Sequence, residues 1–224
     1  MSGALVIGVG PGIGTSVARA FARGGLPVGL LARSRPTVDA AHRALAGTGV
    51  ATYTATADAA DPEQLDTAVT GFVDRFGLPD VVVYNAAVIQ PDALGDLSLQ
   101  RHVEAWSVNV GGVIASAAMV LPGMAARGAG TFLVTGGMPE PLPDYLSLSL
   151  GKAGVRTLVE MLDAQFAPAG VHVASVTVDG PVAPGTAFDP DDIAEHYTRL
   201  HAQPRALWER EVLHSGTDAV ERAG

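Results

Sequence analysis

The sequence predicts an α/β domain of the Rossmann-like class, in which helices cover both faces of one doubly wound parallel sheet of about seven strands. Short apolar segments with strand composition alternate with helix-forming segments along the chain, as in folds built from βαβ units. In the stretch ALVIGVGPGIG (residues 4–14), an apolar strand ends in a glycine-rich loop that opens a helix. At 224 residues we expect a single domain over 1–224, with a short helix and a last strand in 187–224.

The expected strands are apolar segments rich in β-branched residues, a composition that favours a pleated, buried surface. They cover residues 4–7, 28–32, 50–55, 81–83, 131–135, 171–178 and 211–214. The strand at 81–83 consists of three valines, as expected for a strand covered on both faces.

The expected helices cover residues 15–23, 38–45, 62–76, 99–119, 147–166 and 193–201. Gly24 and Gly25 end the first of these helices. Asp61 and Pro62 begin the third as an N-cap and a first-turn proline, and Ser98 begins the fourth.

Composition excludes several classes of function. The 14 basic and 23 acidic residues give a formal net charge of −9 without a basic stripe, so no nucleic acid partner is expected. No apolar run approaches the ~20 residues of a membrane span, and no signal peptide is recognisable, so we expect no membrane partner and a cytoplasmic location. Cysteine is absent, and His196 and His201 are five residues apart rather than four, so no metal site is expected.

The glycine-rich loop is the first candidate site. A strand that stops in glycines and becomes a helix presents backbone N–H groups at a positive helix end, which suits a pyrophosphate. The candidate residues are Gly8, Gly10, Gly12, Ile13 and Gly14. A tight turn that binds nothing is the alternative.

Arg33 and Ser34 follow the second strand, where a dinucleotide fold meets the adenosine ribose. A carboxylate there accepts from the 2′-hydroxyl of NAD, whereas a cation neutralises the 2′-phosphate of NADP. Ala32 supplies no carboxylate, and the planar guanidinium of Arg33 matches a phosphate. NADP(H) is therefore the expected cofactor and NAD(H) the less favoured one, unless Arg33 and Arg35 are only solvated loop charges.

The spacing of Gly8, Gly12 and Gly14, G-x-x-x-G-x-G, resembles the short-chain dehydrogenase/reductase family. Further segments resemble that family over nearly the whole chain: Asn85-Ala86 after the fourth strand, Val108-Asn109-Val110-Gly111, Ser149 to Val155 around Lys152, and Pro181 with Thr186.

The resemblance implies a role for each matching residue. Asp58 contacts the adenine, Asn85 and Ala86 lie at the cofactor ribose, Lys152 holds the nicotinamide ribose, and Pro181 and Thr186 lie at the carboxamide. It also implies a small-molecule substrate and pairing of copies into a homodimer or homotetramer.

The family's catalytic tetrad of Asn, Ser, Tyr and Lys is matched only in part. Asn109 and Lys152 match, but the tyrosine stands four residues before the lysine, and here that residue is Leu148, which cannot transfer a proton. The serine falls on Thr135 or on a neighbouring glycine. We therefore expect a divergent member that lacks the tyrosine and has lost the serine or shifted it to Thr135.

Two questions remain open at the catalytic end. Asn109, a polar residue in an apolar helix, needs a partner, either a water chain to Lys152 or the backbone of a kink. The proton donor is Tyr145, Thr135 or water. Tyr145 stands seven residues before Lys152, roughly 10 Å along a helix, so it reaches a substrate only if residues 141–145 fold over the site.

Two functions are compatible with these residues. One is an NADP(H)-dependent oxidoreductase that acts on a carbonyl or alcohol with a non-standard proton donor. The other is a dinucleotide-binding protein without that redox step, such as a sensor, a partner subunit or an enzyme of different chemistry. Leu148 favours the second function, whereas Asn109, Lys152 and Thr186 favour the first.

Overall fold

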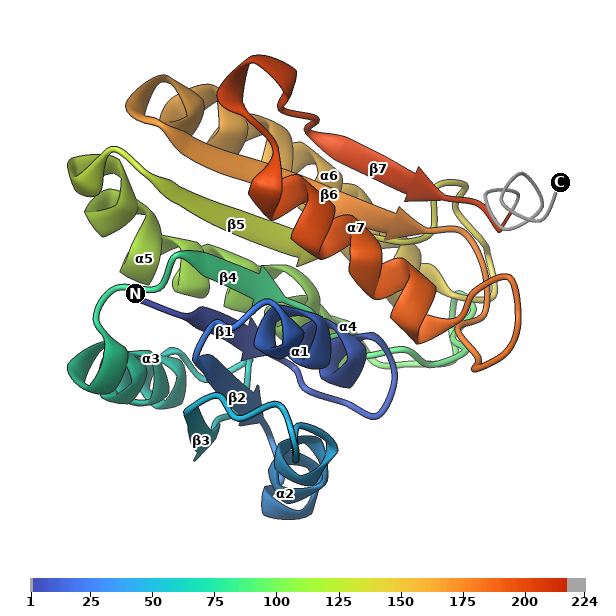
Figure 1. Ribbon diagram of the computed structural model, residues 1–224. Coiled ribbons are helices and arrows are strands. Elements are labelled where there is room, and N and C mark those ends of the chain that lie inside the picture. Colours follow the sequence, from blue (N-terminus) through green and yellow to red (C-terminus); the bar gives the residue numbers. More distant parts are fainter. Residues whose placement is uncertain (1, 217–224) are drawn as a thin grey trace, which may run out of the picture.

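The structure is a computed structural model and describes residues 2–216, so the end of the predicted region 187–224 lies outside the described residues. Strands and helices alternate along the chain (Figure 1). The strands are β1 (Ala4–Ile7), β2 (Val28–Ala32), β3 (Thr52–Thr56), β4 (Val81–Tyr84), β5 (Gly130–Thr135), β6 (Val171–Val178) and β7 (Glu211–His214). The α-helices are α1 (Ile13–Arg23), α2 (Arg35–Ala44), α3 (Pro62–Phe76), α4 (Leu99–Trp106), α5 (Gly112–Arg127), α6 (Leu146–Phe166) and α7 (Pro190–Ala202).

The seven strands form one parallel sheet in the order β3-β2-β1-β4-β5-β6-β7, which confirms the predicted fold class. The strand order reverses between β1 and β4, and such a reversal leaves a crevice at the carboxyl ends of the strands. All strands point to the same edge, so the loops that follow them gather there.

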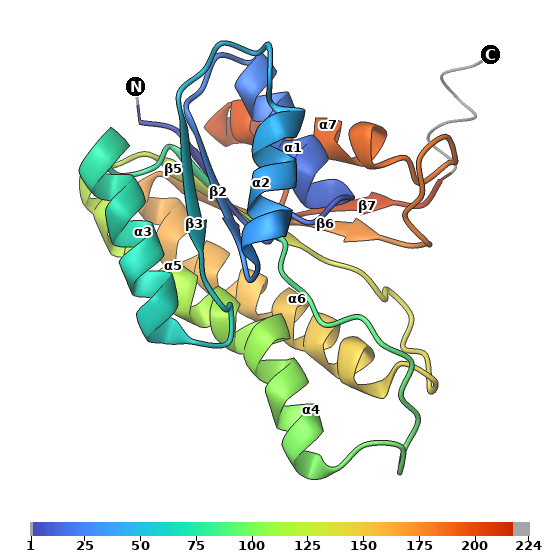
Figure 2. The same cartoon turned by 90° about the horizontal axis from the view of Figure 1, so that it is seen from below.

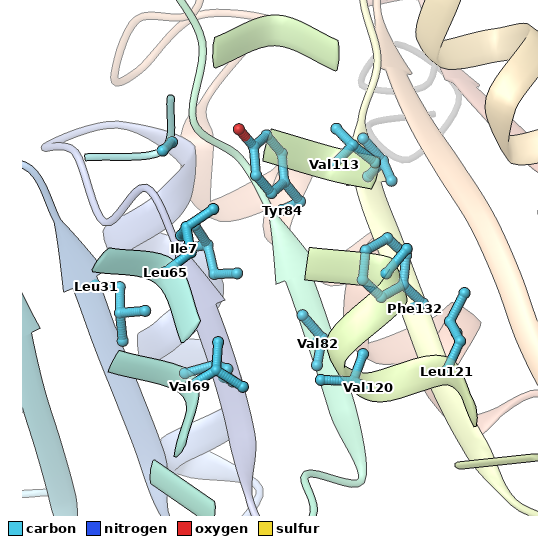
Figure 3. Packing of buried hydrophobic residues seen from close by; sticks show 14 of the residues in the cluster. Ile7, Leu31, Leu65, Val69, Val82, Tyr84, Val113, Val120, Leu121 and Phe132 are labelled. Atoms are coloured by element: carbon cyan, nitrogen blue, oxygen red, sulfur yellow. The ribbon is translucent and has the colours of Figure 1, made fainter. Parts of the chain in front are cut away.

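Helices cover both faces of the sheet (Figure 2). On one face α1, α2 and α7 bury a core with β1, β2 and β6, and on the other α3, α5 and α6 bury a second core. Figure 3 shows the second core, in which Val82 and Tyr84 of β4 lie against Val120 and Val113 of α5. Burial of apolar side chains on both sides explains why the central strands contain almost no polar residues.

The helix expected over residues 99–119 is the main departure from prediction. It is interrupted by a π-helical turn, Ser107–Gly111, and then continues as α5 to Arg127. A π turn widens the helix and commonly marks a functional site. Here it contains Asn109, for which a kink was one of the two expected alternatives.

The continuous helical run Leu99–Arg127 is long and apolar enough to cross a membrane, with a mean hydropathy of 1.6 in its most apolar window. Half of that window is buried inside the domain, where α5 packs against α3 and β5. A core helix of a folded domain meets the same two criteria of length and composition.

Candidate functional site

A cleft of about 1510 Å³ runs along the carboxyl edge of the sheet. Its walls come from the loops after β1 to β6, from α4, and from residues 136–148. The cleft is larger than the 300–1,000 Å³ typical of a small-molecule pocket, as a site for both a dinucleotide and a second molecule would be. Of the predicted site residues, the cleft is lined by Gly8, Gly10, Gly12, Ile13, Arg33, Ser34, Asp58, Asn85, Ala86, Thr135, Tyr145, Lys152 and Pro181.

The four glycines of the loop serve two different purposes. A Cβ at Gly14 would lie 2.2 Å from the Gly8 carbonyl oxygen, and one at Gly8, where φ is +98°, would lie 2.4 Å from the Ala86 nitrogen. These two glycines let the chain pack closely, and Gly14 does not line the cleft. A Cβ at Gly10 would meet nothing within 4 Å, and one at Gly12 only Val182 at 3.8 Å. The packing does not require these two glycines, and they leave open space on the cleft floor.

Helix α1 begins beside that open space. Its N-cap, Gly12, provides no side-chain hydrogen bond, and its first turn contains no acidic residue. The first N–H groups of a helix lack intrahelical partners, and together with the helix dipole they attract anions. The loop and the helix end therefore fit the phosphates of a dinucleotide.

Arg33, the cation predicted after β2, lines the cleft, whereas Arg35 does not. Arg33 is exposed and has no ion-pair partner among residues 2–216. Arg35 pairs with Asp39 at 2.8 Å on the outer side of α2. Ser34 caps α2 and bonds the Thr37 hydroxyl at 2.7 Å, and both residues line the cleft. Thr37 was missed in the sequence, although it faces Ser34 one turn into a capped helix.

Asp58 lies at the carboxyl end of β3, on the same wall of the cleft. Its carboxylate accepts a hydrogen bond from the Ala60 N–H at 2.9 Å, and its own N–H donates to the Gln64 side chain at 3.1 Å. These contacts fix Asp58 just after β3, the strand that pairs with β2.

Asn85 ties three strand ends together. Its amide nitrogen donates to the Gly8 carbonyl at 2.8 Å, and its amide oxygen accepts from the Thr135 hydroxyl at 2.8 Å. The Thr135 hydroxyl is also 2.7 Å from that of Tyr197, which is fully buried in α7. The hydroxyl of Thr135 is thus held by two partners within the fold, which is a structural arrangement rather than that of a free proton donor.

Asn109 is satisfied by backbone. Its amide oxygen accepts from the Val88 N–H at 2.7 Å, and its amide nitrogen lies 3.4 Å from the Val88 carbonyl. The π turn around Asn109 is supported from below by Tyr84, whose hydroxyl donates to the Val108 carbonyl at 2.5 Å. Asn109 does not line the cleft, and within residues 2–216 its side chain bonds Val88 whereas Lys152 bonds Thr135.

Lys152 lies in the middle of the cleft wall with only 7 % of its surface exposed. Its ammonium donates to the backbone carbonyl of Thr135 at 2.6 Å. Burial disfavours the charged form and lowers the pKa of Lys152 to about 8. The amine has further N–H donors available toward the cleft, so it can hold hydroxyl groups of a ligand.

Leu148 and Tyr145 occupy the wall next to Lys152. Leu148, one helical turn before the lysine, is buried and lines the cleft with a side chain that has no polar atom. Tyr145 is the N-cap residue of α6 and also lines the cleft. Residues 141–145 do fold as a loop along the site, where the 92–145 bridge and the bond from the Leu146 N–H to the Asp92 carbonyl hold them.

The structure does not bring Thr186 to the cleft. Its hydroxyl donates to the Ala183 carbonyl at 2.8 Å and accepts from the Phe188 N–H at 3.1 Å, so it closes a local turn before α7. Pro181 and Val182 line the cleft instead. The residue spacing matches the family, but the turn after Ala183 directs the hydroxyl back onto its own backbone.

The histidines bond other groups of the fold: a second histidine, side-chain hydroxyls or backbone carbonyls. The Nε2 of His196 lies 3.0 Å from the Nδ1 of His214, and His201 lies 2.9 Å from the Thr131 hydroxyl. Within residues 2–216 no three His, Cys, Asp or Glu side chains are grouped to hold a metal ion.

Known proteins share both the sequence pattern and the fold. The model of the short chain dehydrogenase family matches residues 2–187. An uncharacterized oxidoreductase of Staphylococcus saprophyticus is 28 % identical over 225 residues, with 93 % of this chain and 94 % of that protein covered. A glycine betaine reductase of Emericella nidulans is 26 % identical over 94 % of this chain, but the chain spans only 18 % of that protein's length.

Among solved structures, an alcohol dehydrogenase of Thermococcus sibiricus, complexed with 5-hydroxy-NADP, superimposes with a TM-score of 0.84 at 27 % identity. The match covers 94 % of this chain and 95 % of that one. The range matched by the family model, residues 2–187, contains the glycine loop, Arg33, Asn85 and the helix that carries Lys152. The chain belongs to the short-chain dehydrogenase family, whose members are NAD(P)-binding oxidoreductases.

Proposed function

We propose that this protein binds NADP(H) and exchanges a hydride between it and a small carbonyl or alcohol substrate. One observation carries the proposal: an exposed arginine without an ion-pair partner among the described residues stands at the end of β2, beside a cleft floor that Gly10 and Gly12 leave open. That arrangement supports a ligand with a pyrophosphate and a further phosphate on its adenosine ribose. The Thermococcus relative, which carries an NADP derivative, supports the same cofactor.

The residues that would hold the cofactor are all present on the cleft wall. The loop from Gly8 to Ile13 would take the pyrophosphate, and Arg33 with the Ser34 and Thr37 hydroxyls would take the 2′-phosphate. Lys152 would donate to the hydroxyls of the second ribose. When bound, the nicotinamide supplies the hydride.

The chain's own contribution to the reaction is to orient the substrate and to move one proton. Reduction of a carbonyl requires a proton on the oxygen, and a positioned acid typically accelerates that step by ~10²–10⁴-fold. The Leu148 side chain has no acidic proton, and the Thr135 hydroxyl is hydrogen-bonded to Asn85 and Tyr197. Tyr145 is the remaining phenol on the cleft wall, so we assign the proton to Tyr145, with water as the alternative carrier.

A second function is favoured by Leu148 and the occupied Thr135 hydroxyl. Both features fit a member of the family that binds the dinucleotide and has given up the carbonyl reaction, as a sensor or a partner subunit would. In that case the cofactor half of the cleft would keep its affinity without any turnover.

One experiment separates the two functions. The purified protein is titrated with NADPH and with NADH by cofactor fluorescence, and a panel of aldehydes and ketones is then followed at the absorbance of the reduced cofactor. Tighter binding of NADPH together with turnover supports the oxidoreductase. Binding without turnover of any carbonyl supports the second function, and failure of both nucleotides to bind would sink the proposal.

We further propose that copies of the chain pair through α4. Leu99, Val103 and Trp106 lie at helical spacing along α4 and are 79, 48 and 47 % exposed. Three large apolar side chains on one helix face suit burial against another protein surface. Light scattering should report a dimer or tetramer for the native chain, and Trp106→Glu should shift it toward the monomer.

A further inference from the structure

The backbone of Met138 is strained. Its φ is +47°, the left-handed region, and within residues 2–216 no other residue except glycine has a positive φ. A side chain in that region clashes with its own backbone, so such residues occur where the surrounding structure holds them, and they gather at functional sites. Met138 lines the cleft three residues after the end of β5.

Arg156 holds this strained segment in place. Its guanidinium donates to the Gly137 carbonyl at 3.1 Å and to the Met138 carbonyl at 2.9 Å. Arg156 lies on α6 one helical turn after Lys152, so the helix that carries the lysine also fixes the strained residue.

The other end of the segment is fixed as well. The Leu142 N–H donates to the Ser149 hydroxyl at 3.1 Å, and the Asp92 N–H donates to the Asp144 carbonyl at 2.8 Å. Residues 138–145 therefore form a wall that is anchored at both ends and stiffened by three prolines, at 139, 141 and 143.

Several large apolar side chains lie around this wall, together with the polar Gln90 and Glu140. Met138, Leu142 and Leu148 line the cleft on this side, and Val88 and Ile89 line it on the other. Leu142 is 47 % exposed and Ile89 72 % exposed, although both are large and apolar. The cleft's Arg101 and Glu104 bind each other at 3.0 Å, which leaves them partly neutralised. Exposed apolar side chains inside a cleft indicate that a ligand covers them.

We propose that Met138 determines which substrates fit, and that the substrate places an alkyl or aryl group beside its carbonyl against Met138, Leu142 and Leu148. Arg156 is the positioning residue that keeps Met138 in this strained conformation. The inference rests on the proposed function for the reacting carbonyl, but the binding preference is measured separately from turnover.

The first test compares two small ketones that differ in polarity, 2-octanone and dihydroxyacetone. Binding of each to the protein saturated with NADP⁺ is measured by calorimetry. Met138→Gln keeps the side-chain length and makes it polar, so the preference for 2-octanone should fall at least fivefold. Met161→Ala, on an exposed part of α6 away from the cleft, should leave the preference within twofold.

Arg156→Met should lower the same preference at least fivefold while the dissociation constant of NADPH stays within twofold. A partial recovery is expected in Arg156→Lys, since an ammonium can reach one of the two carbonyls. An unchanged preference in both Met138→Gln and Arg156→Met would overturn the proposal. If the preference shifts as expected but no ketone is turned over, the reaction assigned above fails while Met138 keeps its role in binding.

The strain itself is tested without any cofactor. Glycine normally destabilises a chain relative to alanine, but alanine at a left-handed φ is strained and glycine is not. Met138→Gly should therefore melt at a higher temperature than Met138→Ala. A higher midpoint for Met138→Ala would show that the backbone is not strained at this residue, and the proposal would lose its basis.

Discussion

The two halves of the cleft differ in how completely their polar groups are committed to the fold. In the half that we propose for the nucleotide, Gly10 and Gly12 leave open space that the packing does not require, and Arg33 extends from the end of β2 without an ion-pair partner among residues 2–216. In the half that we propose for the substrate, the Thr135 hydroxyl is bonded twice within the protein, and the buried side chain of Leu148 has no polar atom. One half is prepared for a ligand with charge, and the other for a ligand with apolar surface.

The residues proposed for nucleotide binding and those proposed for proton transfer lie on different elements of this fold. The cofactor loop depends on close packing between α1, β1 and β4, whereas the acid depends on a single side chain on α6. A substitution of the side chain on α6 should therefore leave the packing of the cofactor loop intact. Substitutions that act on one half and not on the other are therefore the most informative.

The largest effect is expected when a phenol is introduced at position 148, on the wall that we propose for the substrate. Leu148→Tyr places an acid one helical turn before Lys152, whose charge stabilises a phenolate. Turnover of a reactive ketone should rise about 100-fold, within the range of a positioned acid. Steady-state rates at saturating NADPH measure this increase in turnover. Leu150→Tyr, on the exposed side of the same helix, is the matched control and should have no such effect. Equal rates in the two variants would contradict the assignment of the substrate half.

The next effect concerns the nucleotide half alone. Arg33→Ala should weaken NADPH binding about 30-fold, or ~2 kcal/mol for a charge-assisted contact, and leave NADH binding nearly unchanged. Arg35→Ala removes the same charge from a residue that pairs with Asp39 instead, and its exposed pair is worth well under ~1 kcal/mol. Fluorescence titration of both nucleotides against both variants gives the comparison. Equal losses for NADPH and NADH would contradict the 2′-phosphate site.

The sequence predicted the fold and most of the cofactor wall because these depend on local patterns. Strand composition, the glycine spacing and the cap residues act within a few residues of one another, and apart from the helix expected over 99–119 the observed helices begin and end close to the expected residues. The position of Arg33 follows from its place after β2. Such features do not require knowledge of distant contacts.

The side chains at the catalytic end are held by contacts between residues that are distant in the sequence. Sequence patterns predicted their positions less well. The Thr135 hydroxyl is held by Tyr197, a residue 62 positions away, and the Thr186 hydroxyl turns back to Ala183. The strain at Met138 is imposed by Arg156 across the loop. A residue type and a spacing do not show which partner captures a hydroxyl or a carbonyl.

A smaller effect is expected at Tyr145. Tyr145→Phe removes one hydroxyl from the cleft wall. Because Tyr145 ends a loop and is a less well positioned acid than a residue within a helix, the rate of ketone reduction should fall by only about tenfold. The dissociation constant of NADPH should not change, because Tyr145 lies on the substrate side. The measurement is kcat against pH for both proteins. An unchanged kcat would leave water as the proton carrier.

The smallest effect is expected at Lys152, which lies where the two halves meet. Burial lowers the pKa of Lys152 from its ordinary 10.5 to about 8 in the folded protein. Between these values the unfolded chain binds the proton and the folded chain has released it, so the stability of the fold rises with pH. From pH 7 to pH 9 this group should add about 1 kcal/mol, a few degrees in the melting temperature for a chain of this size. Lys152→Met lacks the group and should lose that part of the pH dependence, while its midpoint at pH 7 gains from removal of the buried charge. If the melting temperatures of the two proteins change equally with pH over this range, water reaches the amine. The cleft wall would then be more open than the Thr135 contact implies.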